Sequence, residues 1–170
     1  MPHHCKSHAE STNHGDSLCN SETEDWLKKG NACHKAGIYS EAVNWYRKAA
    51  EQGNLEAQHL LGLCYLCGQG LPNDDLIALH WINKAARRGD GNSLCFMGAC
   101  FASGWPDLIQ KDFAEAYKFF THAHAHGEKI SLEWLESLHT WASPQELEEG
   151  ARRAREYRIS SDKAKITLGF

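Results

Sequence analysis

The chain has 170 residues, 42% of them apolar, and its six Trp and six Phe can supply the core of one domain. A net charge of -4 without any long basic run excludes the electrostatic footprint of nucleic-acid binding. Nowhere do about 18 apolar residues run together, and the first twenty residues lack the apolar core of a signal peptide. We therefore expect an intracellular, cytoplasmic protein without membrane insertion.

The first segment, residues 1–22, is polar and predicts a disordered tail. It contains residues of the types that bind zinc, namely His3, His4, Cys5, His8, His14 and Cys19. No second CxxC or HxxxH at finger spacing completes a site, so metal binding by this cluster stays open. The chain has seven cysteines, an odd number without regular pairing, and we expect them to be reduced thiols.

An internal repeat follows. A shift of 36 residues superimposes AVNWYRKAAEQGN, from Ala42, on ALHWINKAARRGD, from Ala78, and a shift of 38 then brings in AYKFFTHAHAHGE from Ala116. The recurring positions are Ala42, Ala78 and Ala116; Trp45, Trp81 and Phe119; Ala49, Ala85 and Ala123; and Gly53, Gly89 and Gly127. Their spacing predicts three helices with one small and aromatic face, each ended by a left-handed Gly cap.

The segments before these helices also recur. Leu61-Gly62, Tyr65 and Gly68 fall opposite Met97-Gly98, Phe101 and Gly104. A Gly in mid-helix is less favourable than Ala by roughly 1 kcal/mol, so Gly62 and Gly98 indicate close approach between paired helices. Two helices in each unit of about 36 residues are typical of an α-solenoid.

Two related repeat families resemble this pattern. The stretch from Gly30 to Ala49 resembles a tetratricopeptide motif at Gly30, Asn31, Ala32, Gly37, Tyr39, Ala42, Tyr46 and Ala49. The stretch from Ala57 to Asp90 resembles a Sel-one-like repeat at Leu61, Gly62, Tyr65, Gly68, Gly70, Asp74, Ala78 and Trp81. The third unit, from Ser93 to Glu128, has Trp105 and two extra residues in its loop, which we expect to be irregular.

The last part of the chain predicts a closing element. LEWLESLHTW has Glu136 and His139 where the repeat has Gly and an aromatic residue, so the fourth unit is degenerate. Ser143-Pro144-Gln145-Glu146 predicts a capping box, with early Glu and late Arg residues in the helix that follows. The expected fold is all-α, a right-handed α/α superhelix of about four helix-turn-helix repeats with a C-terminal capping helix. It occupies residues 23–158, and residues 159–170 form a flexible tail.

Candidate chemistry is sparse. Cys64 and Cys67 form a CxxC, but near the end of a helix, where no helix N-terminus lowers a thiol pKa. His122 and His126 share a helix face at a spacing that zinc can use, without a third ligand. No nucleophile elbow or phosphate-binding Gly loop is present. We expect no catalysis, no cofactor and no metal.

The family resemblance implies a partner-binding surface. In tetratricopeptide arrays the first helix of each unit lines the concave groove, and its offsets from Gly30, Gly62 and Gly98 carry over to this chain. They give Glu24, Leu27, Asn31, His34 and Lys35; Glu56, His59, Leu63, Leu66 and Cys67; and Asn92, Cys95, Ala99, Ala102 and Ser103. The groove is apolar in the middle and suits an extended or helical segment of another protein.

We therefore expect a non-catalytic scaffold or adaptor that binds other proteins. Two alternatives stay open. The first is a metal- or redox-responsive module that uses the Cys and His clusters. The second is a hydrolase of the kind proposed for some secreted relatives.

Overall fold

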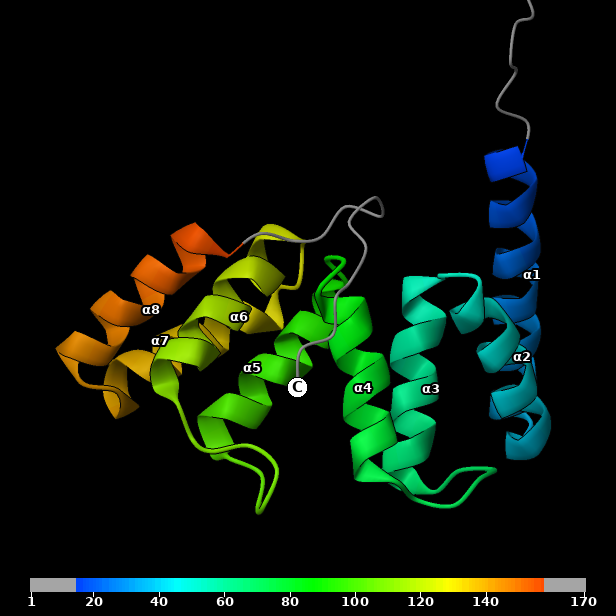
Figure 1. Cartoon of the computed structure of the whole chain (residues 1–170), viewed down its shortest axis with the longest axis horizontal. Helices are drawn as coiled ribbons and strands as arrows, with labels where there is room; N and C mark the ends of the chain where they lie inside the picture. Colours follow the sequence, from blue (N-terminus) through cyan, green and yellow to red (C-terminus); the bar gives the residue numbers. More distant parts are fainter. Residues whose placement is uncertain (1–14, 158–170) are drawn as a thin grey trace, which may run out of the picture.

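The computed structural model describes residues 15–157, which form eight α-helices in an extended stack (Figure 1). They are α1 (Gly15–Lys35), α2 (Tyr39–Glu51), α3 (Leu55–Cys67), α4 (Asp75–Ala86), α5 (Gly91–Ser103), α6 (Phe113–Ala125), α7 (Ile130–Trp141) and α8 (Pro144–Glu156). Extended backbone pairing over this range consists of one isolated bridge between Trp105 and Ile109. The predicted all-α solenoid is confirmed.

The helices pair as the repeat predicts. α1 packs on α2, α3 on α4 and α5 on α6, while α2 and α4 each join their unit to the next first helix. The repeated glycines after the second helices, Gly53, Gly89 and Gly127, have φ of 88°, 91° and 95°. A left-handed residue ends a helix because it turns the chain away from the helix axis at little steric cost for Gly.

Mid-helix glycines let the paired helices approach, as expected. An added Cβ on Gly62 would lie 2.5 Å from Cγ1 of Ile82 and 3.0 Å from the carbonyl oxygen of Ala78. An added Cβ on Gly98 would lie 2.7 Å from the ring of Phe120. The close packing between the helices offsets the lower helix propensity of Gly relative to Ala.

The core runs along the stack as three clusters. The first surrounds Tyr46 and Leu61, the second Ile82 and Leu94, and the third Phe120 and Leu138. Ile82 comes from α4 and Leu94 from α5, so the second cluster is shared by two successive units. Each unit thus buries its apolar face against its neighbours, as in a solenoid.

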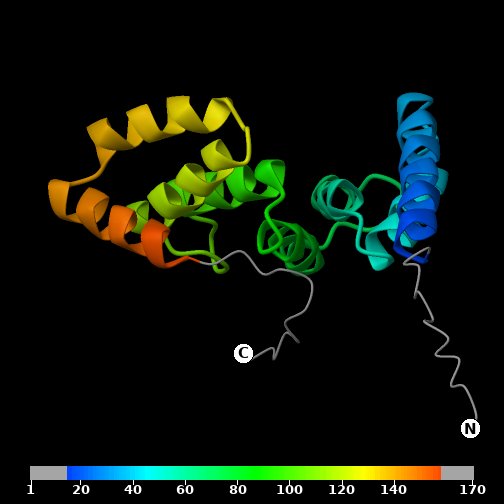
Figure 2. The same ribbon diagram turned by 90° about the horizontal axis from the view of Figure 1, so that it is seen from above.

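The fourth unit departs from the pairing of the others. α7 and α8 both pack on α6 instead of forming a tight pair with each other, and Figure 2 shows them diverging from the turn that joins them. Gly150 of α8 sits so close to α6 that a Cβ would lie 2.7 Å from Cβ of Tyr117. One guanidinium nitrogen of Arg153 lies 3.0 Å from a carboxylate oxygen of Asp112 and 2.9 Å from one of Glu115. These contacts fix α8 across α6.

The predicted capping box at the start of α8 is present. The Glu146 backbone N–H donates to Oγ of Ser143, and the Ser143 backbone N–H donates to the Glu146 carboxylate. Glu149 and the late arginines also pair, since Arg153 Nε lies 2.8 Å from a Glu149 oxygen. The helix that the sequence predicts to close the stack does so.

The described range differs from the expected domain bounds at the first helix. α1 begins at Gly15, upstream of the expected domain start at residue 23. The expectations for residues 1–14 and 158–170, including most of both tails, lie outside the described residues. Of the helices described, none has both the length and the apolar character needed to cross a bilayer.

Candidate protein-binding face

We call the surface formed by the predicted partner-binding positions on α1, α3 and α5 the first-helix face. Its positions follow a regular gradient of exposure. Those at either end of each helix are exposed, namely Lys35, Glu56, Cys67, Asn92 and Ser103. Those between them are half-buried, namely Asn31, His34, His59, Leu63, Leu66, Cys95 and Ala99. At most offsets the equivalent residues of successive units therefore have a similar environment.

Two predicted positions are exceptions: Ala102 is 5% exposed and packs in the third core cluster, and the other is Leu27. It is 9% exposed and packs in the first core cluster with Tyr46 and Leu61. A side chain buried in the core has little surface left for a partner, so we leave Leu27 out of the proposed binding surface. His59 and Cys95, at the same offset in the next units, keep part of their surface.

The apolar positions of α3 and α5 have two roles. Leu63, Leu66 and Cys95 pack against the second core cluster, and Ala99 packs against the third. All four nevertheless keep an accessible part. They form a mostly uncharged strip, with Glu56 as the charged residue among the predicted positions of these two helices.

His59 joins two units within the first-helix face. Its Nδ1 lies 3.0 Å from Oγ of Ser93, a fully buried residue of α5. The Ser93 backbone N–H donates to Asp90, the N-cap of that helix, at 2.7 Å. Burial lowers the pKa of the His59 imidazole, and the carboxylates of Asp90 and Glu128 partly oppose that shift. Burial between α3 and α5 therefore favours the neutral form of His59.

This environment predicts a pH dependence of stability. A His whose folded pKa lies below its unfolded value of about 6.5 stabilises the fold fully above that pH. As the pH falls below about 6.5, the unfolded chain takes up the proton first and the free energy of unfolding decreases. Urea unfolding at about pH 7.5 and about pH 5.5 should show a larger loss for wild type than for His59→Gln. Equal losses of unfolding free energy in both proteins would contradict the assignment of this pH dependence to His59, because the other histidines contribute equally to both.

Two further polar contacts hold the first unit. His34 Nε2 lies 3.0 Å from Oε1 of Gln69, in the loop of the next unit. The Tyr46 hydroxyl donates to Oδ1 of Asn31 at 2.8 Å. Burial raises the pKa of the Tyr46 hydroxyl to about 12, with a smaller contribution from the nearby Cys64. The hydroxyl therefore stays protonated and can donate the hydrogen bond. The hydrogen bond from the buried Tyr46 thus fixes the orientation of the Asn31 side chain.

The CxxC of α3 shows no sign of an activated thiol. Cys64 is buried, and burial, with a smaller effect of Cys67, raises the pKa of its thiol to about 11. Cys67 is exposed at the end of the helix, as the sequence predicts. Because the reactive species is the thiolate, a raised pKa disfavours dithiol redox chemistry and metal ligation at Cys64.

Of the two histidines that share a face of α6, His122 is engaged in packing, whereas His126, the C-cap of the helix, is exposed. His122 Nε2 donates to the carbonyl oxygen of Ala154 at 2.9 Å, and its ring lies 4.8 Å from that of Tyr157. Among the side chains of residues 21–157, no group of three or more His, Cys, Asp and Glu is placed to hold a metal ion. The candidate ligands His3, His4, Cys5, His8 and His14, and the side chain of Cys19, lie outside the described residues.

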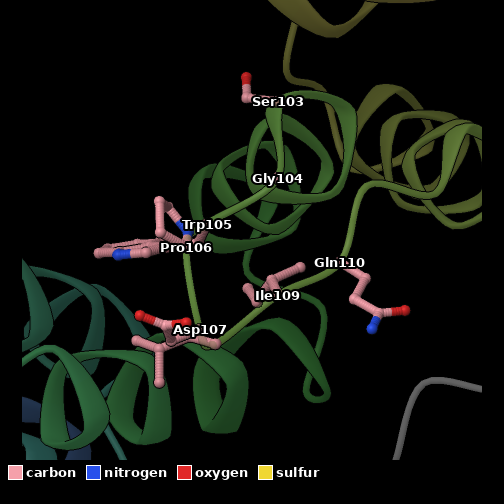
Figure 3. A pocket seen from close by; sticks show the side chains of 8 residues that line it. Ser103, Gly104, Trp105, Pro106, Asp107, Ile109 and Gln110 are labelled. Atoms are coloured by element: carbon pink, nitrogen blue, oxygen red, sulfur yellow. The ribbon is translucent and has the colours of Figure 1, made fainter.

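The irregular third loop is ordered by its own hydrogen bonds. The backbone N–H of Trp105 donates to the carbonyl oxygen of Ile109 at 2.7 Å, and the backbone N–H of Ile109 donates to the carbonyl oxygen of Trp105 at 2.9 Å. Asp107 at the tip has φ of 62°. Residues 103–110 line an open hollow of about 590 Å³, and Figure 3 shows Trp105 and Gln110 pointing to opposite sides of the loop. The two extra residues thus build a distinct surface feature.

Paired helices, left-handed glycine ends and clusters shared between units define a helical-repeat protein. The Sel1 repeat family model matches residues 39–54, 55–90 and 91–123. The chain belongs to the Sel1 repeat family, whose members generally mediate protein–protein interaction and are typically non-catalytic scaffolds. The first matched stretch covers α2 and the turn after it, so the tetratricopeptide character of the first unit stays a resemblance.

Two solved structures resemble the fold. One is c5321, a protective antigen present in uropathogenic Escherichia coli strains that displays an SLR fold, with a TM-score of 0.73 and 20% identity over 91% of this chain. The other is a Sel1 repeat protein from Oxalobacter formigenes, with a TM-score of 0.66 and 26% identity over 83% of this chain. The chain spans 36% and 61% of the length of these two proteins.

Proposed function

We propose that the chain is a protein-binding adaptor that holds a segment of a partner protein along its first-helix face. The observation that carries this proposal is the partly accessible apolar strip of Leu63, Leu66, Cys95 and Ala99, bordered by exposed polar positions. Protein interfaces commonly have an apolar centre and a polar rim. A segment with two or three apolar anchors fits this arrangement.

The links between units support a preformed surface. The contact of His59 with Ser93 joins α3 to α5, and that of His34 with Gln69 joins α1 to the loop after α3. A surface fixed before binding loses less conformational entropy when the partner docks. We place this adaptor in the cytoplasm, where the free thiols of the described cysteines would stay reduced.

The test is affinity capture from the native cell with wild type beside Leu63→Arg with Ala99→Arg. Two arginines in the middle of the strip should abolish capture of the partner, because they place unpaired charge in an apolar contact. The matched control is Asn44→Arg with Gln52→Arg, which adds the same charge at exposed positions of α2 and its C-cap. Circular dichroism must show that both variants remain helical.

Retention of every partner by the folded first-helix variant would show that this face does not bind them. Loss of partners in the control as well would assign the effect to net charge rather than to the strip. The proposal requires loss in the first variant and retention in the control.

A further inference from the structure

The exposed apolar side chains of this protein are not scattered. Among residues 21–157, eight large apolar side chains are exposed. Five of them, Ile38, Tyr39, Leu76, Ile77 and Leu108, lie in the loops inside the first three units or in the helix turns that follow. The other three belong to α7. Leu76 is the most exposed, at 67%.

These loops lie on one side of the stack. The chain passes from first to second helix at residues 36–38, 68–74 and 104–112, and Figure 1 shows all three passages along the lower edge. With the first turns of α2 and α4, the segments are 36–41, 68–77 and 104–112. We call these three segments together the loop edge. Its first two segments touch, since an added Cβ on Gly70 would lie 2.4 Å from the backbone carbon of Tyr39. The edge is separate from the middle of the first-helix face.

The loop edge has a fixed backbone. Asp74 and Asp112 each accept the backbone N–H three residues later, at 2.9 Å, and so cap α4 and α6. The Trp105 and Ile109 backbones are paired, and Ile109 packs against the second core cluster. Apolar side chains on such a scaffold can be covered without ordering a loop, which favours binding.

The charge of the loop edge is negative. Its carboxylates are Glu41, Asp74, Asp75, Asp107 and Asp112, and its single ammonium group is that of Lys111. Arg153 of α8 neutralises Asp112 at 3.0 Å, and Lys111 lies over the ring of Phe113. Carboxylates still exceed cations, so a cationic partner is attracted and an anionic one repelled.

We propose that the loop edge is a second protein-binding surface, for a partner segment that carries apolar side chains beside Lys or Arg. Leu76, Ile77 and Leu108 receive the apolar side chains, and Asp75 and Asp107 face the cations. The hollow of about 590 Å³ lined by residues 103–110 gives room for one anchoring side chain at the end of the edge. This surface is independent of the adaptor proposal for the first-helix face.

The probe is a fluorescent amphipathic peptide of Leu and Lys, about 14 residues long, with its Leu and Glu counterpart as the charge control. Anisotropy with the full chain should show binding of the Lys peptide that weakens between about 50 and about 300 mM NaCl. Leu76→Asp with Leu108→Asp should raise the Kd at least about tenfold. Both side chains are exposed, so these substitutions leave the core intact.

Matched variants locate the effect. Ile130→Asp with Leu132→Asp places the same charges at exposed apolar positions of α7 and should leave the Kd unchanged. Leu63→Arg with Ala99→Arg should also retain binding, which separates this surface from the first-helix face. Asp75→Asn with Asp107→Asn should weaken binding and reduce its salt dependence.

A photoreactive version of the Lys peptide gives a second readout on wild type. Attachment within residues 36–41, 68–77 or 104–112 supports the proposal, and attachment on α1, α3, α5 or α7 overturns it. Equal binding of the Glu peptide, or an equal loss in the α7 variant, also overturns it. Sedimentation that shows a dimer broken by Leu76→Asp would assign the edge to a second copy of the chain instead.

Discussion

Replacing Gly70 by Ala should destabilise the protein by about 2–5 kcal/mol, one of the largest effects of any single methyl group in this chain. Gly70 has φ of 76°, where a side chain costs about 1–2 kcal/mol. Its added Cβ would also lie 2.4 Å and 2.5 Å from the backbone carbon and oxygen of Tyr39. Backbone cannot rotate away as a side chain can, so the loops of the first two units must separate. Urea unfolding followed by circular dichroism measures the loss.

Gly37→Ala is the matched control. Gly37 has the same φ of 76°, but nothing lies within 4 Å of its added Cβ. The Gly37→Ala substitution should therefore destabilise the protein only through the strain of a left-handed backbone conformation, by about 1–2 kcal/mol. The difference between the two variants measures the contact between units alone. Equal losses would mean that the loop of residues 68–74 does not rest on the first unit.

The repeat made most of the fold predictable. Residues such as Ala42, Trp45 and Gly53 recur with the 3.6-residue period of a helix and with a cap, and these local features need no tertiary information. Gly62 and Gly98 further indicated the pairing, because a mid-helix Gly is unfavourable unless another element packs against it.

The fourth unit was predictable only in part. Its capping box is local, so the start of α8 could be placed. Its packing depends on Gly150 against Tyr117 and on Arg153 beside Asp112, contacts between residues more than thirty positions apart. No periodic pattern carries such information, and the missing Gly in α7 removes the signal for pairing with α8.

The binding surfaces, too, were predictable from the sequence only in part. Offsets from Gly30, Gly62 and Gly98 place equivalent residues, but they do not say that Leu27 is covered by the core while His59 is not. The loop edge could not be recognised in the sequence, because Ile38, Leu76 and Leu108 belong to short apolar stretches at three separate places in the chain. Their alignment is a property of the stacked units.

Gly98 and Phe120 should show a reversal of sign in a double-mutant cycle. Phe120 is fully buried, with its ring stacked on Trp134 at 5.4 Å between centroids, so Phe120→Ala should cost about 3–5 kcal/mol. Gly98→Ala alone should destabilise by about 1–3 kcal/mol, because its Cβ would lie 2.7 Å from a ring that Trp134 keeps in place.

In the Phe120→Ala background the same Gly98→Ala change should stabilise, by up to about 1 kcal/mol. The ring that blocked the Cβ is gone, and the higher helix propensity of Ala then decides the result. Urea unfolding of the four proteins at one pH gives the coupling energy. If Gly98→Ala destabilises equally in both backgrounds, its cost comes from the α5 backbone and not from Phe120, and the close packing of α5 on α6 is not what requires Gly at this position.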